Sequence, residues 1–410
     1  MDISKFEKVF NVSYFHVSSI REHRRGILPP EEPEEPRNVY RFYGYELPFK
    51  ATLASKFKSS PPSWIVKERS SNVNIKYKGK LVFTRAFPES FDGIRSLKFT
   101  YDQSNIVVGY GSGNIELMSA MEEEGEDDDF HNDKRNDPIT IKPVQKGFPI
   151  TSISFIPDSS KFFAASECGR VYLCTIDPPV CEEFVEEFHN ELSSIDVNLI
   201  HSNIVTGGKD AGIRIYDIDT SQQTHLFMRK NTLRSYCNED HLYHSLPIHV
   251  VKFHPDYPDL FISGGLDGFA KIWDIRVPDG CIRNINGPYI TGDALEIKDT
   301  NILTGSFQKK NCLQLWDVHS GRLVENIRIR NRLSDVDGEF VKTIKYFKNN
   351  HLTSTIVTGG LNSNVEVIDA TQNKIVFRFP VNKSIIAIDT SENYLAYGGY
   401  EHLLRVTKYL

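Results

Sequence analysis

The sequence predicts an all-β fold in which seven copies of a four-stranded sheet close into a ring. From residue 92 onward one pattern recurs seven times: an alternating strand, a polar turn, a strand that ends in small residues, and a further alternating strand. Each copy takes about 45 residues, which is typical of four-stranded units in a radial array. The 26 Phe and 18 Tyr among the 410 residues also favour strands over helices.

The strands of each copy follow from the alternation of apolar and polar residues. Three per copy are expected at 94–100, 105–111 and 114–120; 149–156, 161–167 and 171–176; 193–199, 203–209 and 213–219; strands ending at 253, 265 and 274; 293–298, 301–307 and 313–319; 341–348, 355–360 and 364–370; and 384–390, 394–400 and 403–409. Fourth strands are expected at 224–229, 323–329 and 375–379. The chain ends before a fourth strand in the last copy, and residues 80–87 can supply it. That closure would leave no exposed strand edge.

The fourth copy carries the most specific motif. One strand ends at Ser263 and two glycines, an Asp-Gly turn begins at Asp267, and the next strand ends at Trp273 and an aspartate. Two strands joined by an Asp-Gly turn predict a β-hairpin. His244 stands nine residues before the end of the preceding strand. This spacing allows His244, Ser263, Asp267 and Trp273 to form one hydrogen-bonded network.

These four residues resemble the defining set of the WD-repeat family of β-propellers. The resemblance implies a seven-bladed WD-repeat β-propeller at residues 80–410, and it gives the four residues a structural role. Blade 3 carries Tyr216 in place of the tryptophan. Blade 5 keeps Trp316 but lacks the Asp-Gly turn, and blades 1, 2, 6 and 7 are identified by periodicity.

Residues 1–79 do not follow the pattern and are expected to form an irregular N-terminal extension. A run of proline and glutamate at 29–36 prevents regular structure, and a basic, aromatic arm follows it. The arm predicts a tether that binds an acidic protein surface. RNA stacking, or packing of the arm on the propeller itself, are the alternatives. Candidate contact residues in the arm are Arg37, Arg41, Lys50, Lys56, Lys58 and Trp64.

Two insertions interrupt the blades. Residues 122–137 form an acidic loop in blade 1 that starts with seven carboxylates in eight positions. It is expected to be a disordered, solubilising insertion or a site for a basic partner such as a histone tail. Residues 230–246 lengthen the connection into blade 4, and long loops on a rigid scaffold concentrate binding residues. Arg234, Tyr236 and Tyr243 are the candidate contacts there.

The sequence predicts no catalytic residues, no cofactor and no metal site. Glycines at 109–113 lie in a hairpin turn rather than at the start of a helix, so they do not indicate a phosphate site. The six cysteines show no C-x-x-C spacing, which favours reduced thiols over zinc ligands. The net charge of −6 argues against a nucleic-acid binder. No apolar stretch reaches the length of a membrane span.

Together these features predict a non-catalytic protein–protein interaction scaffold, monomeric within a hetero-complex. Residues 289–295, 302–306 and 313–317 are similar to segments of WD-repeat proteins of ciliated and flagellated organisms. This likeness implies a cytoskeletal or ciliary assembly in the cytoplasm, with tubulin as a possible acidic partner.

Two other functions stay open. Residues 273–276 resemble the W-D-x-R box of propellers that serve as substrate receptors of cullin-type ubiquitin ligases, and this likeness implies that Arg276 contacts the adaptor. A nuclear chromatin or RNA-processing complex would instead use the acidic loop or the basic arm.

Overall fold

The structure is a computed structural model that describes residues 41–42, 45–46, 79–120, 138–141, 143, 147–229, 242–308, 311–329, 340–348, 355–360 and 364–409. The chain divides into two compact units, Met1–Asn74 and Ile75–Leu410. In the first unit the described residues form a small antiparallel sheet of β1 (Arg41–Phe42) and β2 (Tyr45–Glu46).

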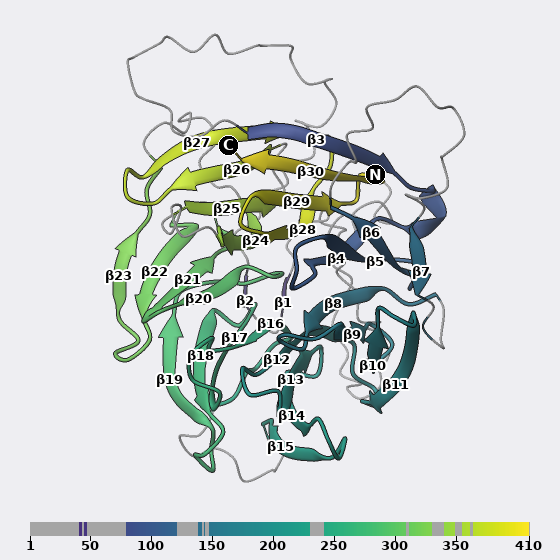
Figure 1. The fold of residues 1–410 in the computed structure, drawn as a ribbon. Helices are drawn as coiled ribbons and strands as arrows, with labels where there is room; N and C mark the ends of the chain where they lie inside the picture. Colours follow the sequence, from purple (N-terminus) through teal and green to yellow (C-terminus); the bar gives the residue numbers. More distant parts are fainter. Residues whose placement is uncertain are drawn as a thin grey trace, which may run out of the picture. The chain divides into compact units, whose positions relative to one another are not determined.

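The second unit is a ring of seven four-stranded antiparallel sheets, shown in Figure 1. The predicted seven-bladed, all-β architecture is therefore confirmed. Blades 1 to 7 consist of β4 (Ile94–Phe99), β5 (Asn105–Tyr110), β6 (Ile115–Ser119) and β7 (Ile139–Ile141); β8 (Ile150–Phe155), β9 (Lys161–Ser166), β10 (Arg170–Thr175) and β11 (Val180–Glu186); β12 (Leu192–Val197), β13 (Asn203–Gly208), β14 (Ile213–Asp217) and β15 (Gln223–Phe227); β16 (Ile248–Phe253), β17 (Leu260–Gly265), β18 (Phe269–Asp274) and β19 (Cys281–Asn286); β20 (Leu295–Lys298), β21 (Asn301–Gly305), β22 (Leu313–Asp317) and β23 (Leu323–Asn326); β24 (Val341–Tyr346), β25 (Thr355–Gly360), β26 (Asn364–Asp369) and β27 (Lys374–Pro380); and β28 (Ile385–Thr390), β29 (Tyr394–Gly399), β30 (Leu403–Tyr409) and β3 (Gly79–Ala86).

The last blade closes the ring with a strand from upstream of the first blade. β3 pairs antiparallel with β30, from Gly79 opposite Tyr409 to Ala86 opposite Leu403. The two ends of the ring are therefore held together by backbone hydrogen bonds within one sheet. Most predicted strands are found within one or two residues of their expected ends. β20 is shorter than predicted, because the backbone turns before it, where the Ala294 N–H donates to the Gly292 carbonyl.

Buried apolar side chains fill the space between neighbouring blades. The second strand of most blades is buried along nearly its whole length, as in β13 and β17. Small residues end these strands because the next blade approaches closely. A Cβ on Gly264 would lie 2.4 Å from Ile290 Cδ1, and one on Gly398 would lie 2.5 Å from Ile94 Cδ1. The small-residue strand ends seen in the sequence are therefore a packing requirement.

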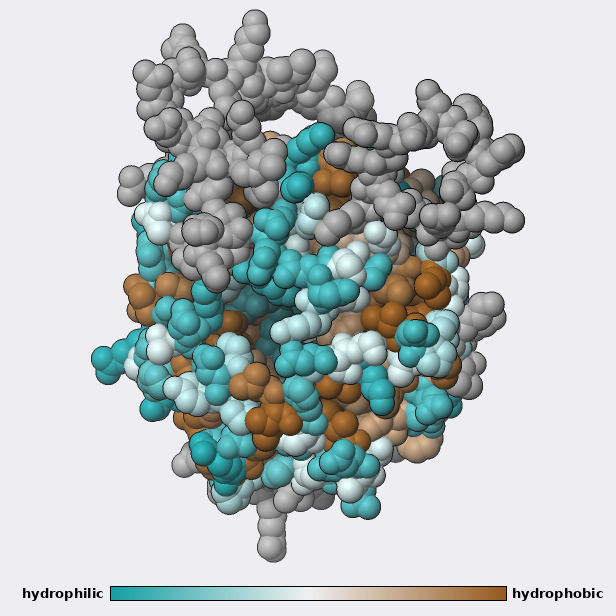
Figure 2. Space-filling view, in the orientation of Figure 1, coloured by the Kyte–Doolittle hydropathy of each residue, from teal (hydrophilic) through white to brown (hydrophobic). Residues whose placement is uncertain are grey.

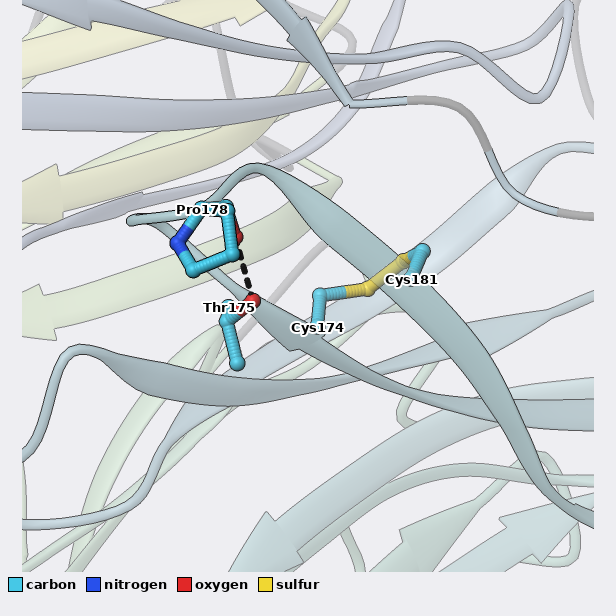
Figure 3. The surroundings of a disulfide bond; sticks show 4 residues. All are labelled: Cys174, Thr175, Pro178 and Cys181. Atoms are coloured by element: carbon cyan, nitrogen blue, oxygen red, sulfur yellow. Dashed lines mark hydrogen bonds between the residues drawn. A yellow bond between two sulfur atoms is a disulfide. The ribbon is translucent and has the colours of Figure 1, made fainter.

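Two of the six cysteines are joined. Cys174 and Cys181 face each other across β10 and β11 and form a disulfide, shown in Figure 3. The prediction of reduced thiols is wrong for this pair, because antiparallel pairing brings the two cysteines directly opposite each other. Cys168 and Cys281 are free thiols, and Cys312 Sγ–H donates to the Gln308 carbonyl oxygen at 2.9 Å. Among the described residues, no helix has the length and apolar character needed to cross a bilayer.

Candidate protein-binding face

The four residues of the predicted network are joined in one chain of buried hydrogen bonds. Trp273 Nε1–H donates to Ser263 Oγ at 2.7 Å, and Ser263 Oγ lies 2.6 Å from His244 Nε2. His244 Nδ1 lies 2.8 Å from an Asp267 carboxylate oxygen. Burial raises the pKa of Asp267, and the hydrogen bond from His244 outweighs this and lowers it. The chain of bonds ties the loop before β16 to β17, to β18 and to the turn between them.

A serine, a histidine and an aspartate in this order also form the triad of acyl-transfer enzymes. Here Ser263 is fully buried and Trp273 donates to the hydroxyl that a substrate would have to reach. The arrangement therefore stabilises blade 4 and offers no reacting atom at a surface.

Blades 3 and 5 use related but different networks. In blade 3 the buried Glu187 takes the place of the histidine: its carboxylate accepts from Thr206 Oγ1 and pairs with Arg214. Arg214 also pairs with Asp210, at 2.6 Å. In blade 5, Trp316 Nε1–H donates to Thr304 Oγ1 at 3.0 Å. Sequence reasoning missed Glu187 and Arg214, because neither residue belongs to the motif.

Side chains of alternating charge form a ring on the innermost strands, around the axis of the propeller, and we call the space that they surround the channel. The first strand of each blade lies innermost, and each of these seven strands contributes the residue at the same position. In blade order these residues are Lys98, Ser154, Asp196, Lys252, Glu296, Lys345 and Asp389. Asp293 adds a further carboxylate, 2.9 Å from Lys252 Nζ and 2.8 Å from Lys345 Nζ. Both lysines also pair with Glu296. The ring closes where Lys98 lies 3.6 Å from Asp389.

The pKa directions favour the charged forms of Asp293 and Asp389, whereas burial lowers the pKa of Lys252. Burial raises the pKa of Asp293, but Lys252 and Lys345 outweigh it and hold it well below its usual range. Burial likewise opposes ionisation of Asp389, and nearby lysines lower its pKa. In Asp196 burial is the larger effect and raises the pKa despite the hydrogen bond from Ser154. The ring is therefore a largely compensated ionic cluster with a structural role.

The carboxylates of this ring also align the innermost strands. The Phe253 N–H of β16 donates to Asp196 of β12 at 2.8 Å, and the Phe99 N–H of β4 donates to Asp389 of β28 at 2.9 Å. Equivalent positions of neighbouring innermost strands therefore lie side by side, and the strands run in the same sense. All the loops that lead into innermost strands meet at one face, which we call the leading face.

A second set of channel residues lies nearer the leading face. In six blades the pairing of the first two strands shifts register and skips the second residue of the innermost strand. A bulge of this kind re-aims the skipped side chain. The skipped residues are Arg95, Thr151, Ser193, His249, Lys342 and Ile386. Three of the six are basic or imidazole side chains.

The loops of the leading face also expose large apolar side chains. Phe188, between β11 and β12, is 75% exposed, and Phe148 and Tyr289 are 41% and 37% exposed. Figure 2 shows hydrophilic residues around a hollow near the middle of one face of the molecule. Apolar anchors around a polar centre are typical of surfaces that bind proteins.

The contact residues predicted from the sequence are not brought together by the described structure. Tyr243 packs partly buried against Trp273, with ring centroids 6.5 Å apart. The Arg276 side chain is 66% exposed on the opposite face, where it pairs with Asp274 at 2.7 Å. Both remain predictions as contact sites. For Arg41 only the backbone, in β1, is described, and Arg37, Lys50, Lys56, Lys58, Trp64, Arg234, Tyr236 and the acidic loop lie outside the described residues.

Sequence reasoning missed the exposed aromatics and the skipped basic residues. Phe148, Phe188 and Tyr289 each stand a few positions before an innermost strand, so their place in the repeat was a usable signal. Among the described residues no group of side chains has the geometry of a metal site.

Comparisons with known proteins agree with the geometry of blade 4. Residues 237–274 match the family model described as "WD domain, G-beta repeat". The chain is similar to Mitochondrial division protein 1 of Saccharomyces cerevisiae, with 23% identity over 166 residues, which is 33% of this chain and 22% of the relative. It is also similar to Methylosome protein WDR77 of Xenopus laevis, with 24% identity over 152 residues, or 36% of this chain and 41% of the relative. The chain thus spans less than half the length of the curated relatives it matches.

Proposed function

Because the chain is a WD-repeat β-propeller protein, we propose that it is a non-catalytic scaffold that binds other proteins through its leading face. WD-repeat proteins are in general interaction scaffolds, and propellers of this family bind protein partners. The proposal assigns this role to a particular surface of this chain.

The observation that carries the proposal is the exposure of Phe188, with Phe148 on the neighbouring loop and Tyr289 on the loop into blade 5. Large apolar side chains that a rigid scaffold exposes to solvent are the usual anchors of a protein–protein interface. The buried groups that resemble catalytic ones, His244 and Ser263, are instead used to hold blade 4 together.

The test compares two substitutions of exposed aromatic residues. Phe188→Ser changes the leading face, and Tyr101→Ser is the matched control, since Tyr101 is 69% exposed in the turn after β4 on the opposite face. Affinity purification with quantitative mass spectrometry should show partners that are reduced about tenfold or more by Phe188→Ser. The control should recover them as the unchanged chain does. Equal recovery by all three proteins would contradict the assignment of the leading face.

We further propose that the scaffold belongs to a cytoskeletal or ciliary assembly, in which the basic arm within residues 1–79 binds an acidic surface such as that of tubulin. The composition of the arm supports this, because charge steering and aromatic anchors together suit such a surface. Co-sedimentation with microtubules should decrease with salt. It should be lost when residues 1–78 are deleted, a change that keeps β3 intact. Undiminished pelleting of the deletion variant would rule out the arm.

A further inference from the structure

Two basic side chains and one imidazole come from different blades at the level of the strand bulges, where Lys342 acts on the pKa of His249 and Arg95 on that of Lys342. Arg95 of β4, His249 of β16 and Lys342 of β24 are all skipped by the register shift of their innermost strands. Blade 5, which lies between β16 and β24, adds no side chain where it meets Lys342, because a Cβ on Gly292 would lie 2.5 Å from the Lys342 carbonyl oxygen. Asp293, the next residue of blade 5, pairs with Lys252 and Lys345 instead.

The polar atoms of this group are only partly used within the fold. Arg95 donates to Tyr400 Oη at 3.0 Å and to Asp92 at 2.9 Å, while its buried Nε has no hydrogen-bond partner in the described structure. The buried His249 Nε2 also lacks one. Lys342 is only 6% exposed, and no described residue pairs with its ammonium group. A largely buried side chain whose ammonium pairs with no described residue can take a counter-ion from a ligand.

The charge of the group defines the kind of ligand. Burial, and then Lys342, lower the pKa of His249 to about 4, so that this side chain is neutral at pH 7. Burial, and then Arg95, lower the pKa of Lys342 to about 8, so that it stays mostly protonated. The carboxylate of Asp92 already pairs with Arg95, and Arg95 also lowers the pKa of the partly buried Glu167, which burial raises more strongly. Among the described residues one positive charge, that of Lys342, stays uncompensated, and a single carboxylate balances it better than a doubly charged phosphate.

We propose that Lys342, His249 and Arg95 form a receptor for one carboxylate side chain of an acidic peptide segment of a protein partner. Lys342 pairs with the carboxylate, and His249 donates a hydrogen bond to it through a ring N–H. Arg95, held by Tyr400 and Asp92, closes the site from blade 1. This inference rests on the proposed function, because the partner would reach the site from the leading face.

The experiment uses the full chain and a fluorescently labelled peptide of ten glutamates, measured by fluorescence polarisation at low salt. Lys342→Met should weaken binding at least tenfold and should be at least as stable as the unchanged chain, because it removes an unpaired buried charge. The matched control is Lys161→Met, since Lys161 is exposed at the start of β9 on the opposite face. It changes the net charge equally and should bind as before.

A second, local measurement follows the His249 ring by NMR. Binding of the glutamate peptide should raise the pKa of His249 from about 4 by at least one unit, and His249→Asn should weaken binding several-fold. Equal binding by all variants would overturn the inference, as would a Lys342→Met chain that fails to fold. So would a His249 pKa near 6.5 without peptide, or binding of inorganic phosphate alone. Such results leave the proposed function intact as long as Phe188→Ser still loses its partners.

Discussion

Replacing Lys345 by methionine tests whether the alternating ring holds the propeller together. The Lys345 side chain is 4% exposed and contacts both Asp293, at 2.8 Å, and Glu296. Its loss leaves two carboxylates with Lys252 as their remaining paired cation. Breaking a buried ion pair in this way costs roughly 3–5 kcal/mol. We expect about 3 kcal/mol, the lower end, because Asp293 is 38% exposed and solvent screens part of its charge.

The assay is urea unfolding followed by tryptophan fluorescence, at several pH values. Lys252 and Lys345 lower the pKa of both acids in the folded state, so their stabilisation is present at neutral pH and is lost as the pH falls through the lowered values. The difference between the two proteins should therefore be full near pH 7 and shrink only as the pH falls below the ordinary pKa values of the two acids, 3.8 and 4.5. The control is Lys348→Met, because Lys348 is 56% exposed beside Asp389 and should contribute less than about 1 kcal/mol. A loss below about 1 kcal/mol for Lys345→Met, or one independent of pH, would refute the reasoning.

Three further changes have defined outcomes. Ser263→Ala removes the hydroxyl shared by a histidine and a tryptophan, and should lower the free energy of unfolding by about 2–3 kcal/mol in the same urea assay; a loss under about 0.5 kcal/mol would count against the network. The folded-state pKa of His249, about 4, lies below its ordinary value of 6.5, so the chain should lose up to about 3 kcal/mol of stability as pH falls from 6.5 to 4. His249→Asn should show a flatter stability profile over that range, and parallel profiles would disprove the assignment. Deleting residues 1–87 removes β3 and leaves β30 without a partner, so this variant should aggregate in light scattering, whereas deletion of residues 1–78 should leave a monomer; identical behaviour would contradict closure by β3.

The strands, their order and the closing strand could be predicted from the sequence because they depend on local patterns. Each blade repeats the same local signals: alternating apolar residues, turn residues between strands, and small residues at strand ends. Each blade also contacts mainly its neighbours in the ring. The network of blade 4 was predictable for a similar reason, since His244, Ser263, Asp267 and Trp273 lie at fixed offsets in one repeat. The pairing of Cys174 with Cys181 could also have been predicted from the sequence, because only a tight turn separates their strands.

The candidate binding site could not be predicted in this way, because its residues come from distant repeats. Arg95 and Lys342 are 247 positions apart in the sequence, and their shared place depends on register shifts that no local pattern marks. The ion-pair partners of Lys345, Asp293 and Glu296, also belong to another blade, and no local pattern marks this pairing. By itself the sequence determined a closed ring of seven blades, since each blade is specified by its own periodicity. Which side chains meet in the channel, and which charge is left without a counter-ion, was decided only by the tertiary structure, because closure brings one position of every blade to a common axis.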